Sequence, residues 1–99
     1  MLTLVKEILA RRIQTHDEND YAIERCRNEL IEALSQNEIL TINILNQLSE
    51  EEILYTSEVF EEIAYNLQSM DYINCLKNIE KKYPSLNIGD CIEVAIAFI

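Results

Sequence analysis

Hydrophobic positions recur at three- and four-residue spacing along most of the chain, which is the period of an α-helix. The first such run covers residues 2–14, where leucine, isoleucine and valine side chains fall on one face. After a polar break at residues 15–20, a second run continues to about Ser35. Asp17 or Asn19 could cap this second helix, because either side chain accepts hydrogen bonds from free helix amides. The pattern therefore predicts two amphipathic helices at the start of the chain.

The next segment, residues 37–48, fits two patterns. Leu40, Ile42 and Ile44 alternate with polar residues, which is typical of a strand. Leu40, Ile44 and Leu48 also satisfy helical spacing. Because the neighbouring segments are helical and no partner strand is evident, we favour a short buried helix over a strand.

A strong start signal follows. Ser49 and Glu52 have the spacing of a capping box, and Leu48 and Ile53 occupy the flanking hydrophobic-staple positions. Three glutamates in the first turn also suit the positive end of a helix dipole. These signals predict a helix that continues to about Gln68.

Two further helices complete the expected fold. Ser69 can cap the first, and Pro84 lies just beyond its end. The last extends over about residues 89–98, and its apolar end must pack on the core or on a partner. One glycine and one proline in 99 residues argue against a β-rich fold, which needs frequent turns. We therefore expect one domain, residues 1–99, with an all-α fold: a compact bundle of five to six antiparallel helices, with HEAT-like stacking of α-hairpins as one arrangement.

The charge distribution is strongly uneven. The net charge is −10 and the pI is about 4.4, yet no lysine or arginine lies between Asn28 and Cys75. This acidic stretch carries the carboxylates of Glu29, Glu32, Glu38, Glu50, Glu51, Glu52, Glu58, Glu61, Glu62 and Asp71. A negative electrostatic field of this kind attracts positively charged partners. It argues against binding to nucleic acid, because such binding needs clustered basic residues. The alternative is a solvated face that only aids solubility.

The sequence offers little for metal binding or catalysis. Cys26, Cys75 and Cys91 are widely spaced on apolar stripes, and His16 stands alone beside Asp17 in a polar turn. We therefore expect core-filling thiols, no metal, no cofactor and no enzymatic activity. No signal peptide or long apolar segment is visible, so we expect a cytoplasmic protein that does not engage a membrane.

A candidate partner-binding surface emerges on the helix expected between residues 49 and 68. An α-helix turns by 100° per residue, which places one stripe of residues on the side of this helix opposite the core positions. A further glutamate lies beside this stripe. The stripe and its flank consist of Glu51, Tyr55, Glu58, Glu61, Glu62 and Tyr65. Tyrosines are frequent anchors at interfaces, and the glutamates could pair with basic residues of a partner. The alternative is an ordinary wet face whose tyrosines pack sideways on neighbouring helices.

The basic residues near the start of the chain have a simpler interpretation. Arg11, Arg12, Arg25 and Arg27 form a small patch in the first two predicted helices. Arg11 follows Glu7 by four residues, and Glu29 follows Arg25 at the same spacing. We expect local ion pairs within each helix.

The second half of the chain resembles small helical immunity proteins of bacterial polymorphic toxin systems, such as contact-dependent inhibition. The resemblance rests on Ser-Glu-Glu-Glu-Ile-Leu at 49–54, Ser-Glu-Val-Phe-Glu-Glu-Ile-Ala-Tyr-Asn-Leu-Gln-Ser at 57–69 and Cys-Leu-Lys-Asn-Ile-Glu-Lys-Lys-Tyr-Pro-Ser-Leu at 75–86. It implies tight, stoichiometric neutralisation of a cognate basic toxin in the cytoplasm. The immunity proteins of DNase colicins look similar in strategy, since their acidic helices with exposed tyrosines occupy a nuclease's basic surface.

A second hypothesis is a small helical adaptor or regulatory subunit, such as a homodimer. Its contacts would be the apolar end, Ala97, Phe98 and Ile99, together with the isoleucine-rich third segment.

Overall fold

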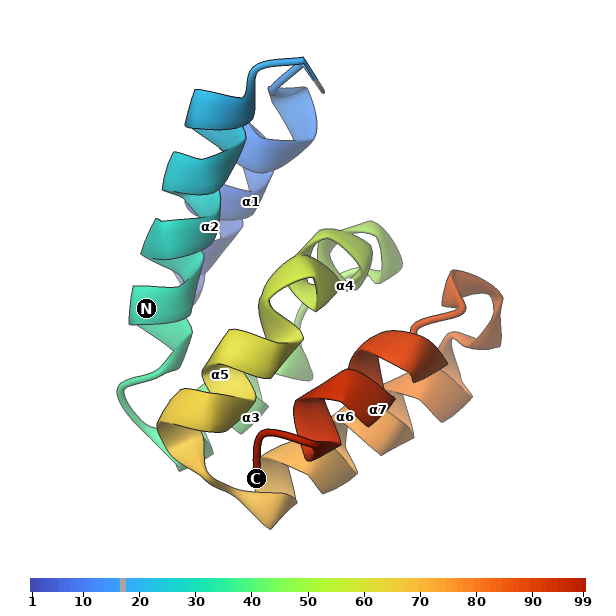
Figure 1. Cartoon of the computed structure of the whole chain (residues 1–99). Helices are drawn as coiled ribbons and strands as arrows, with labels where there is room; N and C mark the ends of the chain where they lie inside the picture. The colour runs from blue at the N-terminus through green and yellow to red at the C-terminus, as the bar shows by residue number, and fades with distance from the viewer. Residues whose placement is uncertain (17) are drawn as a thin grey trace.

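The computed structural model describes residues 1–16 and 18–99, and in these residues it contains α-helices and short 3-10 turns but no strand (Figure 1). The elements are α1 (Leu2–Gln14), α2 (Asp20–Leu34), α3 (Glu38–Leu45), α4 (Glu50–Thr56), η1 (Ser57–Val59), α5 (Phe60–Leu67), α6 (Met70–Lys82), η2 (Pro84–Leu86) and α7 (Gly89–Ile96). The radius of gyration of 12.4 Å matches the value of about 13 Å expected for a compact domain of this length. The expected all-α bundle is confirmed.

The first two helices form a hairpin along one side of the molecule (Figure 1). Their apolar faces bury Val5 and Leu9 of α1 against Cys26 and Leu30 of α2. Asn19 caps α2, since its side chain accepts a hydrogen bond of 3.2 Å from the backbone amide of Ala22. The other predicted cap, Asp17, lies outside the described residues.

The third segment is helical, so the strand alternative is wrong. Asn37 caps α3 by accepting a hydrogen bond from the backbone amide of Leu40 at 2.9 Å. The buried Thr41 donates its hydroxyl to the carbonyl oxygen of Leu34 at 2.7 Å and ties α3 to the end of α2. The helix is buried on one side only, because the side chain of Ile39 is 71% exposed.

The capping box at the start of α4 is present as predicted. Ser49 Oγ accepts from the amide of Glu52 at 3.2 Å, and Glu52 Oε1 accepts from the amide of Ser49 at 2.8 Å. The helix nevertheless ends at Thr56, and the 3-10 turn η1 separates it from α5. The prediction of one continuous helix from 49 to 68 is therefore wrong.

Two hydroxyl groups account for this break. Thr56 Oγ1 donates to the carbonyl oxygen of Glu52 at 2.8 Å, and Ser57 Oγ donates to that of Leu54. Such bonds from a side chain back to the preceding turn bend helices. The core positions of α5 are buried in spite of the break, since Phe60, Ile63 and Ala64 are all at most 1% exposed.

The last two long helices cover the opposite side of the bundle. Ser69 caps α6 as predicted, with its Oγ accepting from the amide of Tyr72 at 3.0 Å. The buried hydroxyl of Tyr72 donates to the carbonyl oxygen of Phe60 at 3.0 Å and joins α6 to α5. α7 ends at Ile96, two residues earlier than predicted, and packs on both α5 and α6.

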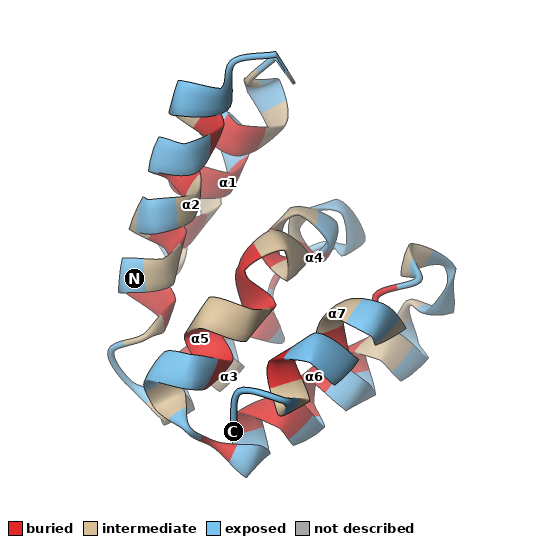
Figure 2. Cartoon of the chain, viewed as in Figure 1, coloured by how far each residue is buried: buried red, intermediate tan, exposed pale blue. Residues whose placement is uncertain are grey.

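Buried residues of all these helices form one apolar cluster, and they face inward between the layers in Figure 2. All three cysteines are free; Cys26 and Cys75 are buried as predicted, and Cys91 is half-buried. No helix in the described part of the chain has both the length and the apolar character to cross a bilayer.

Candidate protein-binding groove

The N-terminal hairpin is fastened to the rest of the molecule by ion pairs with the acidic stretch. Arg12 of α1 donates to both carboxylate oxygens of Glu58, from Nε at 2.9 Å and from Nη2 at 2.7 Å. Arg27 of α2 donates to Oε1 of the same glutamate at 3.3 Å. Lys6 pairs with Glu52 at 2.9 Å. Part of the negative charge is therefore neutralised inside the protein.

Glu58 and Tyr55 do not project into solvent, so this part of the predicted stripe is wrong. Both are half-buried, and the guanidinium of Arg12 lies 4.9 Å from the centre of the Tyr55 ring. Burial alone would raise the pKa of Glu58, but the hydrogen bonds and charges of Arg12 and Arg27 lower it below its ordinary value of 4.5. Glu58 is thus an ionised structural group.

The basic patch also forms different pairs from those predicted. Arg11 makes a bidentate pair with Glu29 of α2, at 2.9 and 3.1 Å, and so bridges the two helices of the hairpin. The local partners expected from spacing, Glu7 and Arg25, form none of the ion pairs recorded in the described residues.

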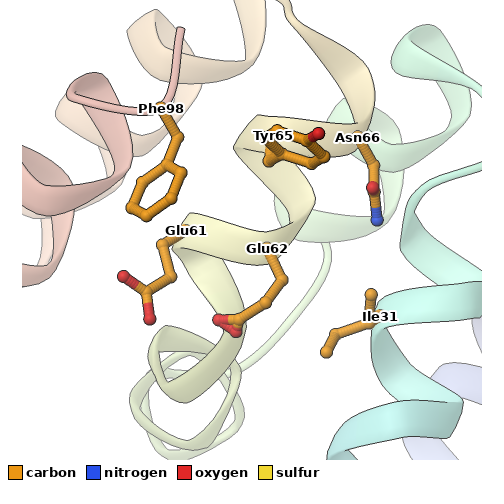
Figure 3. Close-up of a pocket in the computed structure, with 6 residues that line it drawn as sticks. All are labelled: Ile31, Glu61, Glu62, Tyr65, Asn66 and Phe98. Atoms are coloured by element: carbon orange, nitrogen blue, oxygen red, sulfur yellow. The ribbon is translucent and has the colours of Figure 1, made fainter.

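Beyond η1, the exposed side of α5 forms the floor of an open groove of about 410 Å³. We call it the α2–α5 groove; it is lined by Ile31, Glu61, Glu62, Tyr65, Asn66 and Phe98. In Figure 3, Ile31 of α2 faces Glu62 from one side, and Phe98 lies on the other side, next to Glu61. The lining is mostly apolar, with two carboxylates at one end.

Aromatic side chains also line the α2–α5 groove. Tyr65 is 64% exposed, and its ring meets that of Phe98 edge-on at a centroid distance of 6.4 Å. Large exposed aromatic residues of this kind anchor many protein interfaces. These two rings come from α5 and from the turn after α7.

Glu62 is the electrostatically unusual member of the lining. Its Oε1 is buried and has no hydrogen-bond partner in the described part of the protein. Burial, and then the negative charge of Glu61, raise its pKa above the ordinary value. The positive charge of Arg27 opposes this shift, but Arg27 donates its own hydrogen bond to Glu58. The α2–α5 groove therefore carries unbalanced negative charge.

Two amides hold the walls of the α2–α5 groove in place. Gln68, in the left-handed backbone conformation with φ of 48°, donates from Nε2 to the carbonyl oxygens of Tyr65 and Phe98, at 2.9 and 2.7 Å. Asn66 donates from Nδ2 to Ser35 Oγ at 3.0 Å and links α5 to the end of α2. The apolar end of the chain thus docks on α5.

A smaller groove, of about 280 Å³, adjoins the first one. It is lined by Ser57, Glu58, Glu61, Asp90, Cys91 and Val94. Glu61 belongs to both grooves, so acidic side chains continue from α5 to the start of α7.

The structure therefore divides the six predicted binding residues. Glu61, Glu62 and Tyr65 come together in the α2–α5 groove, whereas Glu58 and Tyr55 pack against Arg12. Glu51 is exposed on the first turn of α4 and lines neither groove. The spacing rule missed Ile31, Asn66 and Phe98; the only sequence signal for any of them was the apolar end of the chain.

The side chains of this surface offer carboxylates, an amide and aromatic rings. In the part of the chain that the structure describes, no group of three or more histidine, cysteine, aspartate and glutamate residues is arranged to hold a metal ion. Comparisons with protein-family models, with curated proteins and with solved structures found no match. Two carboxylates beside exposed aromatic rings suit the positively charged side chains of a protein partner.

Proposed function

We propose that this chain is an immunity protein that binds and neutralises a cognate bacterial toxin with a basic surface. The observation that carries the proposal is the α2–α5 groove, where Glu62 has a buried oxygen with no hydrogen-bond partner among the described residues and Tyr65 exposes its ring. Within the free protein this arrangement costs stability, because a partly desolvated carboxylate has one oxygen that makes no hydrogen bond to the described residues. A basic partner would balance its negative charge.

Binding would proceed in two stages on this surface. The net charge of −10 attracts a cationic protein over long range and raises the association rate. Tyr65 and Phe98 then anchor the partner through apolar contact, while Glu61 and Glu62 pair with its lysine or arginine side chains. A nuclease whose basic surface holds nucleic acid would be blocked by such contact.

Co-expression tests the proposal directly. The partner to use is the C-terminal domain of a large secreted toxin encoded next to this chain's gene. We expect this chain to restore the growth of cells that produce the toxin domain and to co-purify with it at one-to-one stoichiometry. Continued growth arrest, with both proteins present and folded and no complex formed, would contradict the proposal.

A second candidate function is a homodimeric adaptor, which is favoured by exposed apolar residues that lie mostly outside the α2–α5 groove. Ile39 and Leu40 of α3 are exposed, as are Phe98 and Ile99 at the end of the chain. Analytical ultracentrifugation separates the two functions, since the immunity proposal needs no self-association. A stable dimer that survives Glu61→Gln/Glu62→Gln but is lost on Ile39→Asp would favour the adaptor.

A further inference from the structure

We infer that the α2–α5 groove is a socket for one arginine side chain of the partner. The inference rests on the proposed function, because it takes the partner to be a basic protein, and it adds the residue that the groove selects. It follows from the size of the groove, from its lining and from an arrangement elsewhere in the same chain.

The size and lining of the groove suit a long amphipathic side chain. Its volume of about 410 Å³ is near the lower end of the range of roughly 300–1,000 Å³ typical of small-ligand sites. It therefore holds a side chain rather than a helix. Ile31 and Phe98 offer apolar contact for an aliphatic stem, and Glu61 and Glu62 receive a charged head.

The protein itself contains a filled site with the same chemistry. Arg12 places its guanidinium 4.9 Å from the centre of the Tyr55 ring and makes two hydrogen bonds to Glu58. The α2–α5 groove also has a tyrosine and a carboxylate three residues apart, Tyr65 and Glu62, although they follow each other in the reverse order along the chain. In the described residues, no lysine or arginine of this chain lines the groove.

Arginine fits these groups better than lysine does. Its planar guanidinium stacks on aromatic rings, binds carboxylates in bidentate fashion and is less strongly hydrated than an ammonium group. The last property matters here, because the lining is mostly apolar and Glu62 is half-buried, so a charged group must shed water as it approaches this carboxylate. The basic residue that influences Glu62, Arg27, is engaged by Glu58.

A titration with short peptides tests the inference without the toxin. The isotopically labelled full chain is followed by NMR while acetyl-Gly-Arg-Gly-amide or acetyl-Gly-Lys-Gly-amide is added. We expect saturable shifts of the Ile31 methyl groups and the Tyr65 and Phe98 rings with the arginine peptide, at a Kd on the order of 1 mM. The lysine peptide should bind at least about threefold more weakly.

Matched variants locate the effect. Glu62→Gln keeps the shape of the side chain and should raise the Kd of the arginine peptide about fivefold or more. Glu51→Gln, at an exposed position outside the groove, should leave that Kd unchanged. Amide spectra show whether each variant is folded. Equal affinity for the two peptides, shifts confined to other surfaces, or equal effects of the two substitutions would overturn the inference.

The outcomes separate this inference from the proposed function. A toxin domain that is neutralised while the arginine peptide fails to bind in the groove would overturn the inference alone. An arginine peptide that binds as expected while the toxin domain is not neutralised would overturn the proposed function alone.

Discussion

Glu58 and Glu62 lie four residues apart and carry the same side chain, yet their surroundings give them opposite properties. Glu58 is bound by Arg12 and Arg27, and its pKa is lowered despite burial. Glu62 is half-buried, one of its oxygens has no hydrogen-bond partner among the described residues, and its pKa is raised. The first residue stabilises the fold, whereas the second lowers stability when it is ionised.

Removal of Glu58 should therefore destabilise the protein. We expect Glu58→Ala to lower the free energy of unfolding by about 2 kcal/mol, because it deletes both hydrogen bonds to the largely buried guanidinium of Arg12. Urea denaturation measures this change. Glu51→Ala, which removes an exposed carboxylate, is the control and should stay within about 0.5 kcal/mol of the wild type. Equal effects would show that the Arg12–Glu58 pair does not hold the hairpin.

Glu62→Gln should have the opposite effect at neutral pH. Because the pKa of Glu62 is raised in the folded protein, ionised Glu62 lowers the free energy of unfolding above that pKa. Below about pH 4 the carboxyl is protonated in both the folded and the unfolded protein, so this penalty disappears. We expect the variant to gain roughly 0.5 kcal/mol, or about 2–4 °C in Tm, at pH 7 and nothing at pH 3.5. Thermal unfolding at the two pH values checks this. A loss of stability at pH 7 would contradict the account of Glu62.

At the level of the elements, local signals predicted the helices well where capping residues mark their ends. Asn19, Ser49 and Ser69 cap the helices that the sequence assigned to them. The break at Thr56 and Ser57 was missed because the apolar period continues through it, although the two adjacent hydroxyl residues were a usable signal.

The α2–α5 groove was only half predictable for a related reason. Spacing along one helix identifies residues that share a face, which is how Glu61, Glu62 and Tyr65 were found. Ile31 and Phe98 reach the groove through tertiary packing of α2 and of the C-terminal turn on α5. No spacing rule connects residues so distant in the chain.

The C-terminal turn should depend on Gln68. Gln68→Gly relieves a left-handed backbone conformation but deletes the hydrogen bonds to the carbonyls of Tyr65 and Phe98. With about 1 kcal/mol for each of these three effects, the free energy of unfolding should fall by about 1 kcal/mol. Nuclear Overhauser effects between Tyr65 and Phe98 should weaken, because the turn loosens. Asn87→Gly relieves a similar φ of 55° far from this contact and should leave those signals unchanged. Undiminished signals in Gln68→Gly would show that Gln68 does not position Phe98.

On the scale of the whole molecule, the uneven charge distribution has an internal role as well as an external one. Each of the four ion pairs in the described residues joins a basic residue of α1 or α2 to a carboxylate of the acidic stretch, namely Glu29, Glu52 or Glu58. Carboxylates of the stretch are therefore paired with the basic residues of the α1–α2 hairpin. The remaining carboxylates of the stretch, Glu61 and Glu62 among them, set the outward field.

This internal pairing predicts acid sensitivity. The pKa values of Glu29, Glu52 and Glu58 are all lowered. For Glu29 the main cause is the hydrogen bond from Arg11. For the other two, burial raises the pKa but is outweighed, by bonds from Ser49 and Lys6 to Glu52 and by bonds from Arg12 and Arg27 to Glu58. Their stabilisation is complete above the ordinary value of 4.5 and is lost as the pH falls through the lowered values. We expect the free energy of unfolding, measured in urea, to fall between pH 4.5 and pH 2.5. A constant or rising value would contradict the pairing.

The most direct measurement compares two double variants that remove the same charge from different places. Glu61→Gln/Glu62→Gln alters the α2–α5 groove, and Glu50→Gln/Glu51→Gln alters the first turn of α4. Stopped-flow mixing with the neighbouring toxin domain gives their association and dissociation rate constants. We predict similarly slowed association for both variants, and dissociation at least about 30-fold faster only for the groove variant. Equal dissociation rates for the two would contradict the central claim that this groove binds the partner.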